Sequence, residues 1–497
     1  MTHFTMFCKI AEEEECVTPA LLIPLEMYAQ EIGFFDHLVH LQLNMKEVKH
    51  TVLDKMVTQI LNIAIGSAYN KDIDTELRPD RQAASVVGQE QFPDQSGINR
   101  FLRRFTPLEL EDLALIHGLT LRRYGQVSQA EVVVIDLDGF GLLAKRKRGL
   151  DFRQFEFVFR GRGHVFACKG YFAHYPGKEG YHVFVAYTGQ YGEVIAYLLD
   201  PGHVSPRSRF YDLYYQILEH LDNSEIRLLF RFDGGITSGE IIEFLMDEGH
   251  LVLSKGNNSR TSRRLARRAN NDTWEWVSPN QQANDLGWIK IPGCRHRGRV
   301  ILLRTFRRDK VLYSHLFLNL PAQVLSVKEA VDLYNARQTM ESMIKESRQV
   351  LWIGHLRTSY YWGLQAFIAL GFLAHNLLTW SQQDVCGGTG LEDLGLKRFL
   401  QDFALTRSGA EGGTRCSNQT HTLSPHSFSA QGSPIYPVPP GFSPEECLPE
   451  PPLMARDLAP PPSSLAVPPR SPPPQGKDPV VWLQTAYRAG QFHGGTS

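Results

Sequence analysis

The sequence predicts an α/β protein in which a mixed sheet follows a helical region and is interrupted by a β-rich insertion. Two observations lead to this prediction. At about residue 131 the spacing of apolar residues changes from three and four, as in a helix, to two, as in a strand. Beyond that point the elements follow in the order strand, hairpin, helix, strand, helix, strand, which is typical of a mixed sheet.

Residues 1–130 are predicted to be helical. Thr51–Ala68 has apolar residues at helical spacing, and Asn99–Phe105 and Thr106–His117 repeat the pattern over shorter stretches. Between them lies Tyr69–Gly97, a polar stretch that we expect to form a loop.

Residues 131–254 contain the first part of the predicted sheet. Val132–Asp138 is rich in β-branched residues and ends in Asp-Leu-Asp-Gly, so we expect a buried strand followed by a turn. Tyr181–Tyr187 and Glu193–Leu199 flank a turn with two glycines and predict an antiparallel hairpin. The remaining predictions are a helix at Arg209–Leu221, a strand at Ile226–Asp233, a helix at Gly239–Asp247 capped by Thr237 or Ser238, and a strand at Leu251–Ser254.

Residues 255–325 form the predicted insertion, since short strands follow one another there with polar turns between them. These strands are Thr273–Val277, Trp288–Ile291, Val300–Arg307 and Val311–Leu320. Residues 326–384 return to the core with helices at Ser326–Val350 and Tyr361–Trp380. For residues 385–497 we expect a disordered Pro-rich tail, because 17 of the 29 prolines lie between residues 431 and 480.

The composition is that of a soluble globular protein. Of the 497 residues 42% are hydrophobic, and 52 basic residues balance 53 acidic ones. This balance argues against a histone-like protein but leaves a local basic patch open. The seven cysteines form no CxxC pair and no Cys/His knuckle, which indicates a reducing cytosol. Tyr361–Trp380 has the length of a membrane span, but its polar residues Gln365, His375 and Asn376 indicate a buried core helix.

Acidic residues at two strand ends are the first candidates for chemistry. Asp136 and Asp138 are two residues apart, so alternation places both side chains on one face of the sheet. Asp233 ends another apolar strand, and ligands of open α/β sheets bind at the carboxyl ends of strands. Strand-end aspartates also cap turns, and Asp before Gly-Gly is ordinary turn chemistry, so both interpretations stand.

A polar stripe on the predicted helix Ser326–Val350 is the third candidate. Its residues recur at spacings of three or four and therefore share one helix face: Tyr334, Arg337, Glu341, Lys345 and Arg348. A solvated face with Arg–Glu and Glu–Lys pairs is the alternative interpretation. A tyrosine is a poor choice for a purely solvated stripe.

Together the acidic residues suit a pair of divalent cations. Mg²⁺ prefers oxygen ligands and takes one or two carboxylates, water and substrate phosphate. Two such ions can promote an in-line phosphoryl displacement. The substrate indicated by nearby charge is nucleic acid, because Lys145–Arg148, Arg260–Arg268 and Arg295–Arg308 are dense in cations. Trp274, Trp276 and Trp288 stand near them and suit base stacking, although each feature alone is more often a solvated face or core.

These residues resemble the DDE transposases of bacterial insertion sequences, in particular the group with a β-rich insertion and the helix signature Tyr-x2-Arg-x3-Glu-x6-Lys. Tyr334, Arg337 and Glu341 match the signature, and Arg348 stands at the lysine position. Within the group, the chain is similar to a subfamily with Asp-x-Asp at the first site and Arg-x-Asp-x-Gly at the second. Asp136-Leu-Asp138 and Arg231-Phe-Asp233-Gly-Gly235 match these motifs. The likeness covers roughly residues 20–380 and includes the subfamily's helical DNA-binding region.

The resemblance implies a ribonuclease H-like fold and cut-and-paste transposition. Asp136 or Asp138, with Asp233 and Glu341, would hold Mg²⁺, for which Mn²⁺ can substitute. The residues that would bind the substrate DNA are Tyr334, Arg337, Lys345 and Arg348 at phosphates and Trp276 or Trp288 at a flipped base. The implied partners are double-stranded DNA, as terminal inverted repeats and as target, and a second protomer that pairs the two ends. The implied location is the bacterial cytoplasm, at the nucleoid.

Two departures from the family pattern leave alternatives open. Gly139-Phe140 follows the first site where family members have a small residue and Thr, so Asp136 and Asp138 both remain candidates. Arg348 keeps the charge of the signature lysine but not its hydrogen-bonding geometry. A catalytically inactive transposase-derived DNA-binding protein and a nuclease of the same fold are the alternative functions.

Overall fold

The computed structural model describes residues 19–403 except 20, 46–48, 147–148, 154–155, 161–162, 171, 173–175, 224–225, 257–258, 309 and 393. The Pro-rich stretch, with Cys416 and Cys447, therefore lies outside the described residues, as do Lys147 and Arg148 of the first basic run. The three described cysteines, Cys168, Cys294 and Cys386, are free thiols.

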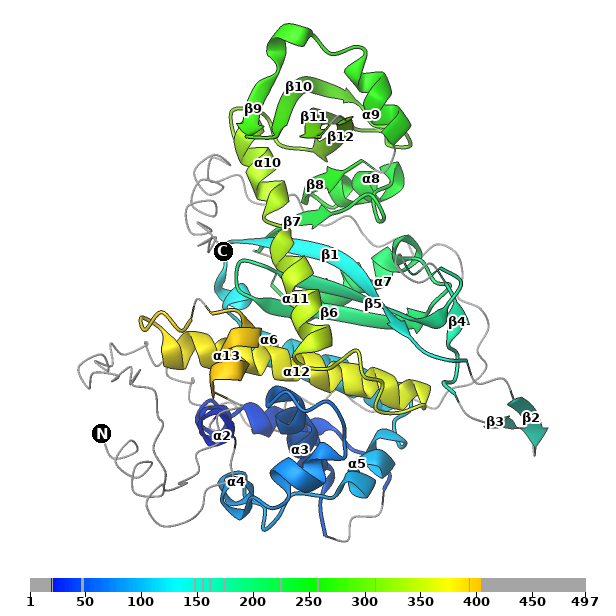
Figure 1. Ribbon diagram of the computed structural model, residues 1–497, viewed down its shortest axis with the longest axis vertical. Helices are drawn as coiled ribbons and strands as arrows, with labels where there is room; N and C mark the ends of the chain where they lie inside the picture. Colours follow the sequence, from blue (N-terminus) through cyan, green and yellow to red (C-terminus); the bar gives the residue numbers. More distant parts are fainter. Residues whose placement is uncertain are drawn as a thin grey trace, which may run out of the picture. The chain divides into compact units, whose positions relative to one another are not determined.

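Five strands form the centre of a mixed sheet (Figure 1). They are β1 (Val132–Leu143), β5 (Glu179–Thr188), β6 (Glu193–Pro201), β7 (Arg227–Phe232) and β8 (Leu251–Lys255). Their spatial order is β6-β5-β1-β7-β8. The pairs β1–β5 and β5–β6 are antiparallel, whereas β1–β7 and β7–β8 are parallel. A leading antiparallel meander followed by two parallel strands on the other side of the first strand is the ribonuclease H-like arrangement, so the predicted fold class is confirmed.

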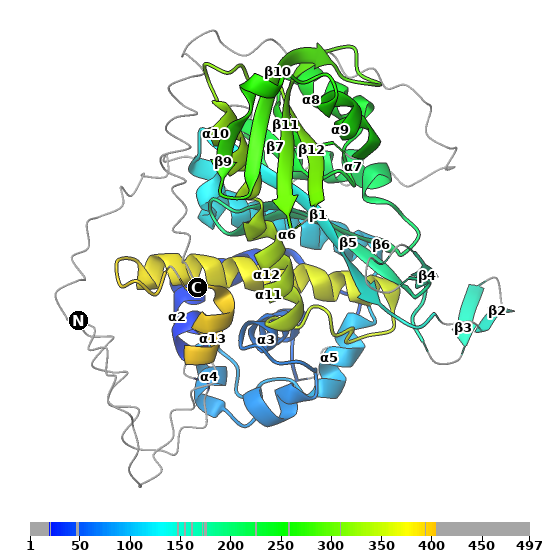
Figure 2. The same cartoon turned by 45° about the horizontal axis from the view of Figure 1, so that its top comes forward.

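The insertion continues the same sheet beyond β8. Its strands are β9 (Glu275–Ser278), β10 (Gln281–Lys290), β11 (Arg297–Arg307) and β12 (Lys310–Leu318). They add in the order β8-β12-β11-β10-β9, and all of these neighbours are antiparallel (Figure 2). The helix α9 (Ser259–Ala266), which carries part of the second basic run, was not predicted. Two short pairings, β2 (Gly149–Arg153) with β3 (Glu156–Arg160), and β4 (Cys168–Lys169) with β5, complete the described strands.

β1 is longer than predicted. We expected a turn after Asp138, but the strand runs on to Leu143 and pairs with β5 throughout. Two glycines permit this close pairing, because a Cβ on Gly139 would lie 2.8 Å from the Phe184 ring and one on Gly141 2.3 Å from the Phe172 ring. Asp138 is therefore a mid-strand residue paired with Val185 of β5, whereas the parallel pairing with β7 ends at Leu137.

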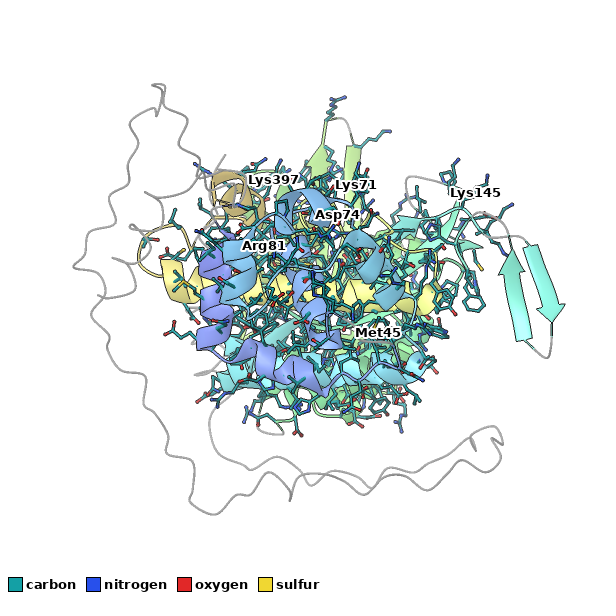
Figure 3. All side chains as sticks on the ribbon, turned by 90° about the horizontal axis from the view of Figure 1, so that it is seen from below. Met45, Lys71, Asp74, Arg81, Lys145 and Lys397 are labelled. Carbon is teal, nitrogen blue, oxygen red and sulfur yellow. The ribbon has the colours of Figure 1, made fainter. Side chains whose placement is uncertain are left out.

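The N-terminal helices are α2 (Leu22–Glu31), α3 (Val52–Ala64), α4 (Arg81–Val86), α5 (Gln95–Leu102) and α6 (Pro107–Tyr124). Thr51 and Thr106 begin α3 and α6 with capping boxes, which explains why the predicted helices start there. The predicted loop Tyr69–Gly97 is partly wrong, since it contains α4 and a helical turn at Ile73–Leu77 whose apolar side chains are buried. The surface there carries both signs of charge, with Lys71, Asp74 and Arg81 exposed (Figure 3).

The remaining helices are α7 (Phe210–Leu221), α8 (Gly239–Asp247), α10 (Val327–Asn335), α11 (Gln338–Gln349), α12 (Tyr361–Cys386) and α13 (Leu396–Phe403). Ser238, one of the two predicted caps, caps α8. The predicted single helix Ser326–Val350 is two helices, α10 and α11. The predicted start of the disordered tail at residue 385 is also wrong, because α13 follows α12 and buries Leu396, Phe399 and Leu400. The one described helix of membrane-spanning length, α12, is largely buried within the protein, as expected for a core helix.

Three buried histidines hold helices against β6, the outer strand of the five-strand centre. His117 of α6, His220 of α7 and His375 of α12 lie 2.8, 2.7 and 3.0 Å from the carbonyl oxygens of Val194, Ile195 and Gly192. Each ring must donate a hydrogen to its carbonyl, and the other ring nitrogen has no described partner. Burial lowers the pKa of His117 to about 3 and those of His220 and His375 to about 4.

These histidines predict a loss of stability in mild acid. The unfolded state binds protons below pH 6.5, the ordinary pKa, whereas the folded state does not until about pH 4. Between pH 6.5 and about 5, each histidine should lower the free energy of unfolding by about 2 kcal/mol. Urea denaturation across this range measures the slope. His220→Gln should remove about one proton from the slope. Equal slopes in the wild type and the His220→Gln variant would contradict the expectation.

Candidate active site

A fully buried ion pair lies behind the candidate site. Asp136 of β1 and Arg231 of β7 are partners in the parallel pairing of the two strands. Arg231 donates from Nε and Nη2 to the two carboxylate oxygens of Asp136, at 2.5 and 2.6 Å. The arginine side chain is 1% exposed and the aspartate side chain 0%. Nη1 of Arg231 also donates to the carbonyl of Leu333 in α10. Both oxygens of Asp136 are thus engaged by one guanidinium.

Asp138 has a different environment. Its side chain is 23% exposed, accepts from the N–H of Gly139 at 2.8 Å and accepts from Nη2 of Arg337. Nη1 of Arg337 lies 3.7 Å from Glu341, so one cation stands between two of the predicted carboxylates. Burial raises the pKa of Asp138 to about 6 in spite of Arg337, and the charges of Asp233 and Glu341 add to the rise.

Arg337 belongs to the wall of a cavity of about 620 Å³, which gathers predicted residues from separate parts of the chain. Asp233 and the two following glycines contribute from the end of β7, Tyr334 from α10, and Arg337 and Glu341 from the start of α11. Asp233 accepts from the N–H of Gly235 at 2.8 Å, which is the turn chemistry expected before Gly-Gly. Burial raises the pKa of Tyr334 to about 12. The spacing of motifs in the sequence therefore corresponds to a real convergence of side chains.

Lys255 lines the same cavity and was not predicted. It is the last residue of β8, beside β7, and its carbonyl lies 2.8 Å from the hydroxyl of Thr237. The same hydroxyl lies 2.8 Å from the carbonyl of Asp233 and donates its one hydrogen to either oxygen. A lysine at the carboxyl end of a predicted strand was the available signal, since ligands of such sheets bind there.

The rest of the predicted stripe lies apart from the cavity. Lys345 and Arg348 are exposed on later turns of α11 and do not line it. The break between α10 and α11 separates only Tyr334 from the others, since Glu341, Lys345 and Arg348 all belong to α11.

The tryptophans of the insertion and its basic runs Arg260–Arg268 and Arg295–Arg308 do not line the cavity. Trp276 is 60% and Trp288 41% exposed. The guanidinium of Arg304 lies 4.1 Å from the ring centre of Trp274. Some cations counted in the basic runs are occupied within the protein: Arg299 is 1% exposed and is bonded to Asp285, and Arg295 pairs with Glu243 and Asp247.

The carboxylates suit hard divalent cations by chemistry. Asp138, Asp233 and Glu341 interact electrostatically around one arginine, and Asp233 and Glu341 face the cavity. Among the described residues, no group of three or more Asp, Glu, His or Cys is assembled as a metal site. One or two carboxylates per ion, completed by water and phosphate oxygens, is the ordinary arrangement for Mg²⁺ and fits this set.

Residues 131–377 match the sequence profile of the family described as Transposase DDE domain. The chain contains a DDE transposase domain. This domain begins at β1 and ends within α12, so it includes the insertion and every predicted carboxylate. No curated protein sequence matches the chain.

Solved transposase structures are distantly similar. A piggyBac transposase synaptic complex with hairpin DNA has 13% sequence identity and a TM-score of 0.43, over 78% of this chain and 79% of that one. A Mos1 transposase paired-end complex with the left transposon end has 13% identity and a TM-score of 0.16, over 42% of this chain and 60% of that one. A pre-cleavage Mos1 transpososome has 13% identity and a TM-score of 0.14, over 41% and 59%.

Arg337→Gln should destabilise the DDE domain more at alkaline pH than at acidic pH. Without the guanidinium, ionised Asp138 is left partly buried and unpaired, which should cost about 2 kcal/mol of unfolding free energy. The pKa of Asp138, already raised to about 6, would rise further. The folded protein then keeps a proton that the unfolded chain releases, so stability falls as pH rises through this range.

Denaturant titrations of the wild type and the Arg337→Gln variant at about pH 5 and 8 test this expectation. Arg348→Gln, on the exposed side of α11, should stay within about 0.5 kcal/mol of the wild type. The double variant Asp138→Asn/Arg337→Gln should recover most of the loss, because no charge is then left unpaired. An equal loss at both pH values would refute the electrostatic explanation.

Proposed function

We propose that this protein is a DNA transposase that cleaves and joins DNA strands by a two-metal, cut-and-paste route, like the insertion-sequence transposases that its motifs resemble. The observation that carries the proposal is the meeting of Asp138, Asp233 and Glu341 around Arg337, within a segment that matches the DDE domain. Their chemistry suits divalent cations, and the cavity is large enough for a phosphodiester group.

Asp138, Asp233 and Glu341 would hold the metal ions, Mg²⁺ in the cell and Mn²⁺ as a substitute. We choose Asp138 over Asp136 because both oxygens of Asp136 are bonded to Arg231. When bound, the ions would activate the attacking oxygen and stabilise the leaving oxygen of an in-line displacement. Charged side chains that contact the phosphate would orient it for in-line attack.

The cavity cations and the tyrosine would orient the DNA. Arg337 can exchange its bond to Asp138 for bonds to a phosphate, for which a guanidinium is well shaped. Tyr334 and Lys255 line the same wall and would donate to neighbouring phosphate oxygens. Lys345 and Arg348, exposed on α11, would contact the backbone farther from the cleaved bond. Trp276 or Trp288, both exposed on the insertion, would stack on an unpaired base.

The partners follow from the reaction. The DNA would be the terminal inverted repeats and a target duplex, and two protomers would bring the two ends together. The helical region before residue 131 would supply part of the sequence recognition. Free thiols at the described cysteines suit the bacterial cytoplasm, where the protein would act on the nucleoid.

The decisive experiment is metal-dependent cleavage of a labelled duplex that carries the inverted repeat flanking the coding region. With Mg²⁺ or Mn²⁺, the wild type should cut at the repeat boundary, and with a chelator it should not. Glu341→Ala and Asp233→Asn should each lower the rate about 10³-fold, since a metal ligand supports several kcal/mol of transition-state stabilisation. Glu219→Ala, exposed on α7, is the matched acidic control and should cut normally.

Two other outcomes would contradict the proposal in different ways. Retarded DNA mobility without cleavage under every metal, unchanged in the carboxylate variants, would indicate a DNA-binding protein that has lost catalysis. Cleavage of RNA–DNA hybrids or branched DNA without any requirement for the repeats would indicate a nuclease of the same fold.

A further inference from the structure

We infer that Asp136 and Arg231 are positioning residues that join the three catalytic segments by one buried contact. We call this contact, made by Asp136, Arg231 and the carbonyl of Leu333, the clamp. The clamp gives a role to the first residue of each aspartate motif, Asp136 and Arg231. Its effect on catalysis rests on the proposed function.

On each of the two strands, the clamp residue lies two residues before the candidate metal ligand. Asp136 is two residues before Asp138 on β1, and Arg231 is two residues before Asp233 at the end of β7. Since strand side chains alternate, residues two apart share a face of the sheet. The parallel register sets Asp136 directly beside Arg231. The ion pair therefore fixes the two strands against each other one step before the ligands.

The third contact of the clamp reaches α10, the helix that directly precedes the one carrying Glu341. Leu333 is the third residue from the end of α10, where carbonyls lack an intrahelical partner. The N–H of Arg337 bonds the carbonyl of Tyr334 at 3.1 Å instead of that of Leu333, and Arg231 donates to Leu333. The chain continues from α10 into α11 through Ala336 and Arg337, both in the right-handed helical conformation, and Arg337 and Glu341 line the cavity. The clamp thus holds the α10–α11 joint on the sheet.

A second arginine makes the same kind of contact at the other end of α10. Arg299 of β11, 1% exposed, bonds Asp285 of β10 at 2.9 Å and donates to the carbonyl of Leu325. Leu325 directly precedes Ser326, the N-cap of α10. The helix is therefore held at both ends by Arg–Asp pairs of the sheet. Only the Asp136–Arg231 pair lies next to the predicted ligands, so the other pair is a matched control.

Because the Asp136 and Arg231 side chains are almost fully buried, we expect their ion pair to position the site rather than to stabilise the fold. Two charges removed from water recover little net stability even when well paired, and apolar replacements of such pairs often leave a protein as stable as before. What an apolar pair cannot supply is a bond to the carbonyl of Leu333. A guanidinium that is locked by both carboxylate oxygens can place that bond accurately.

Hydrogen exchange of the DNA-free, metal-free protein separates the clamp from the proposed activity. Asp136→Asn should raise exchange at the hydrogen-bonded amides of Thr339 and Met340 by roughly 100-fold, because it leaves Arg231 buried and unpaired. Asp138→Asn should leave these rates within about threefold of the wild type, because Asp138 makes none of the contacts of the clamp. Asp285→Asn should raise exchange at the start of α10 and leave Thr339 and Met340 unchanged. Equal effects of Asp136→Asn and Asp285→Asn at the joint would overturn the inference.

Mn²⁺ binding without DNA, followed by the electron paramagnetic resonance of the free ion, tests the consequence for the ligands. Arg231→Lys keeps the charge but cannot bond both oxygens of Asp136 and the Leu333 carbonyl together. It should weaken Mn²⁺ binding roughly 10- to 100-fold, the usual effect of a residue that orients metal ligands. Unchanged or tighter binding would mean that Asp136, once released, is itself a ligand, and would overturn the clamp.

If single variants fold poorly, the double variant Asp136→Leu/Arg231→Met keeps the test open. It removes both charges together and should melt near the wild type, while exchange at the joint stays high and Mn²⁺ binding stays weak. Wild-type exchange and metal binding in this variant would show that the pair only fills the core. If the wild type itself binds no Mn²⁺, the proposed function fails, and the exchange comparison still decides the clamp.

Discussion

The burial of β1 between two strands is the constraint on which the site depends. A charge placed on such a strand must find a partner, because desolvation of an isolated carboxylate is very costly. Asp136 meets this need with Arg231 on the next strand, and the arginine also donates from Nη1 to the Leu333 carbonyl of α10. This one ion pair therefore helps to fix the positions of β1, β7 and α10 relative to one another. The site's geometry follows from a requirement of folding.

The same strand gives Asp138 the opposite environment. Glycines at 139 and 141 let β1 continue where side chains would collide with Phe184 and Phe172, so Asp138 is held in the ladder with β5 and cannot swing as a turn residue could. It contacts Arg337, which lines the cavity. Two aspartates of one motif thus differ in what their oxygens contact, and this difference is the basis for proposing Asp138 rather than Asp136 as a metal ligand.

Periodicity and capping signals were enough to predict most elements. The capping threonines of α3 and α6, the hairpin β5–β6 and the strand–helix–strand run β7–α8–β8 all lie where the pattern indicated. The motif spacing also placed Asp233, Tyr334, Arg337 and Glu341 at one cavity correctly. Three features escaped prediction because their causes are not local. The break at Arg337 coincides with the engagement of the Leu333 carbonyl by Arg231, which is 102 residues distant in sequence. β1 continues because of its neighbours, and Lys255 becomes a site residue only through the pairing of β8 with β7.

Charge in the cavity explains why the carboxylates remain separate in the protein alone. Three acids face one shared cation, and burial raises the pKa of Asp138 to about 6 despite that cation. Gathering the acids more closely would add repulsion, and Arg231 cannot offset it because it is already paired with Asp136. Arg337 and Lys255 are the cations among the described residues that line the cavity. An additional positive charge would favour closer gathering of the acids, whereas an approaching phosphate would compete with Asp138 for Arg337.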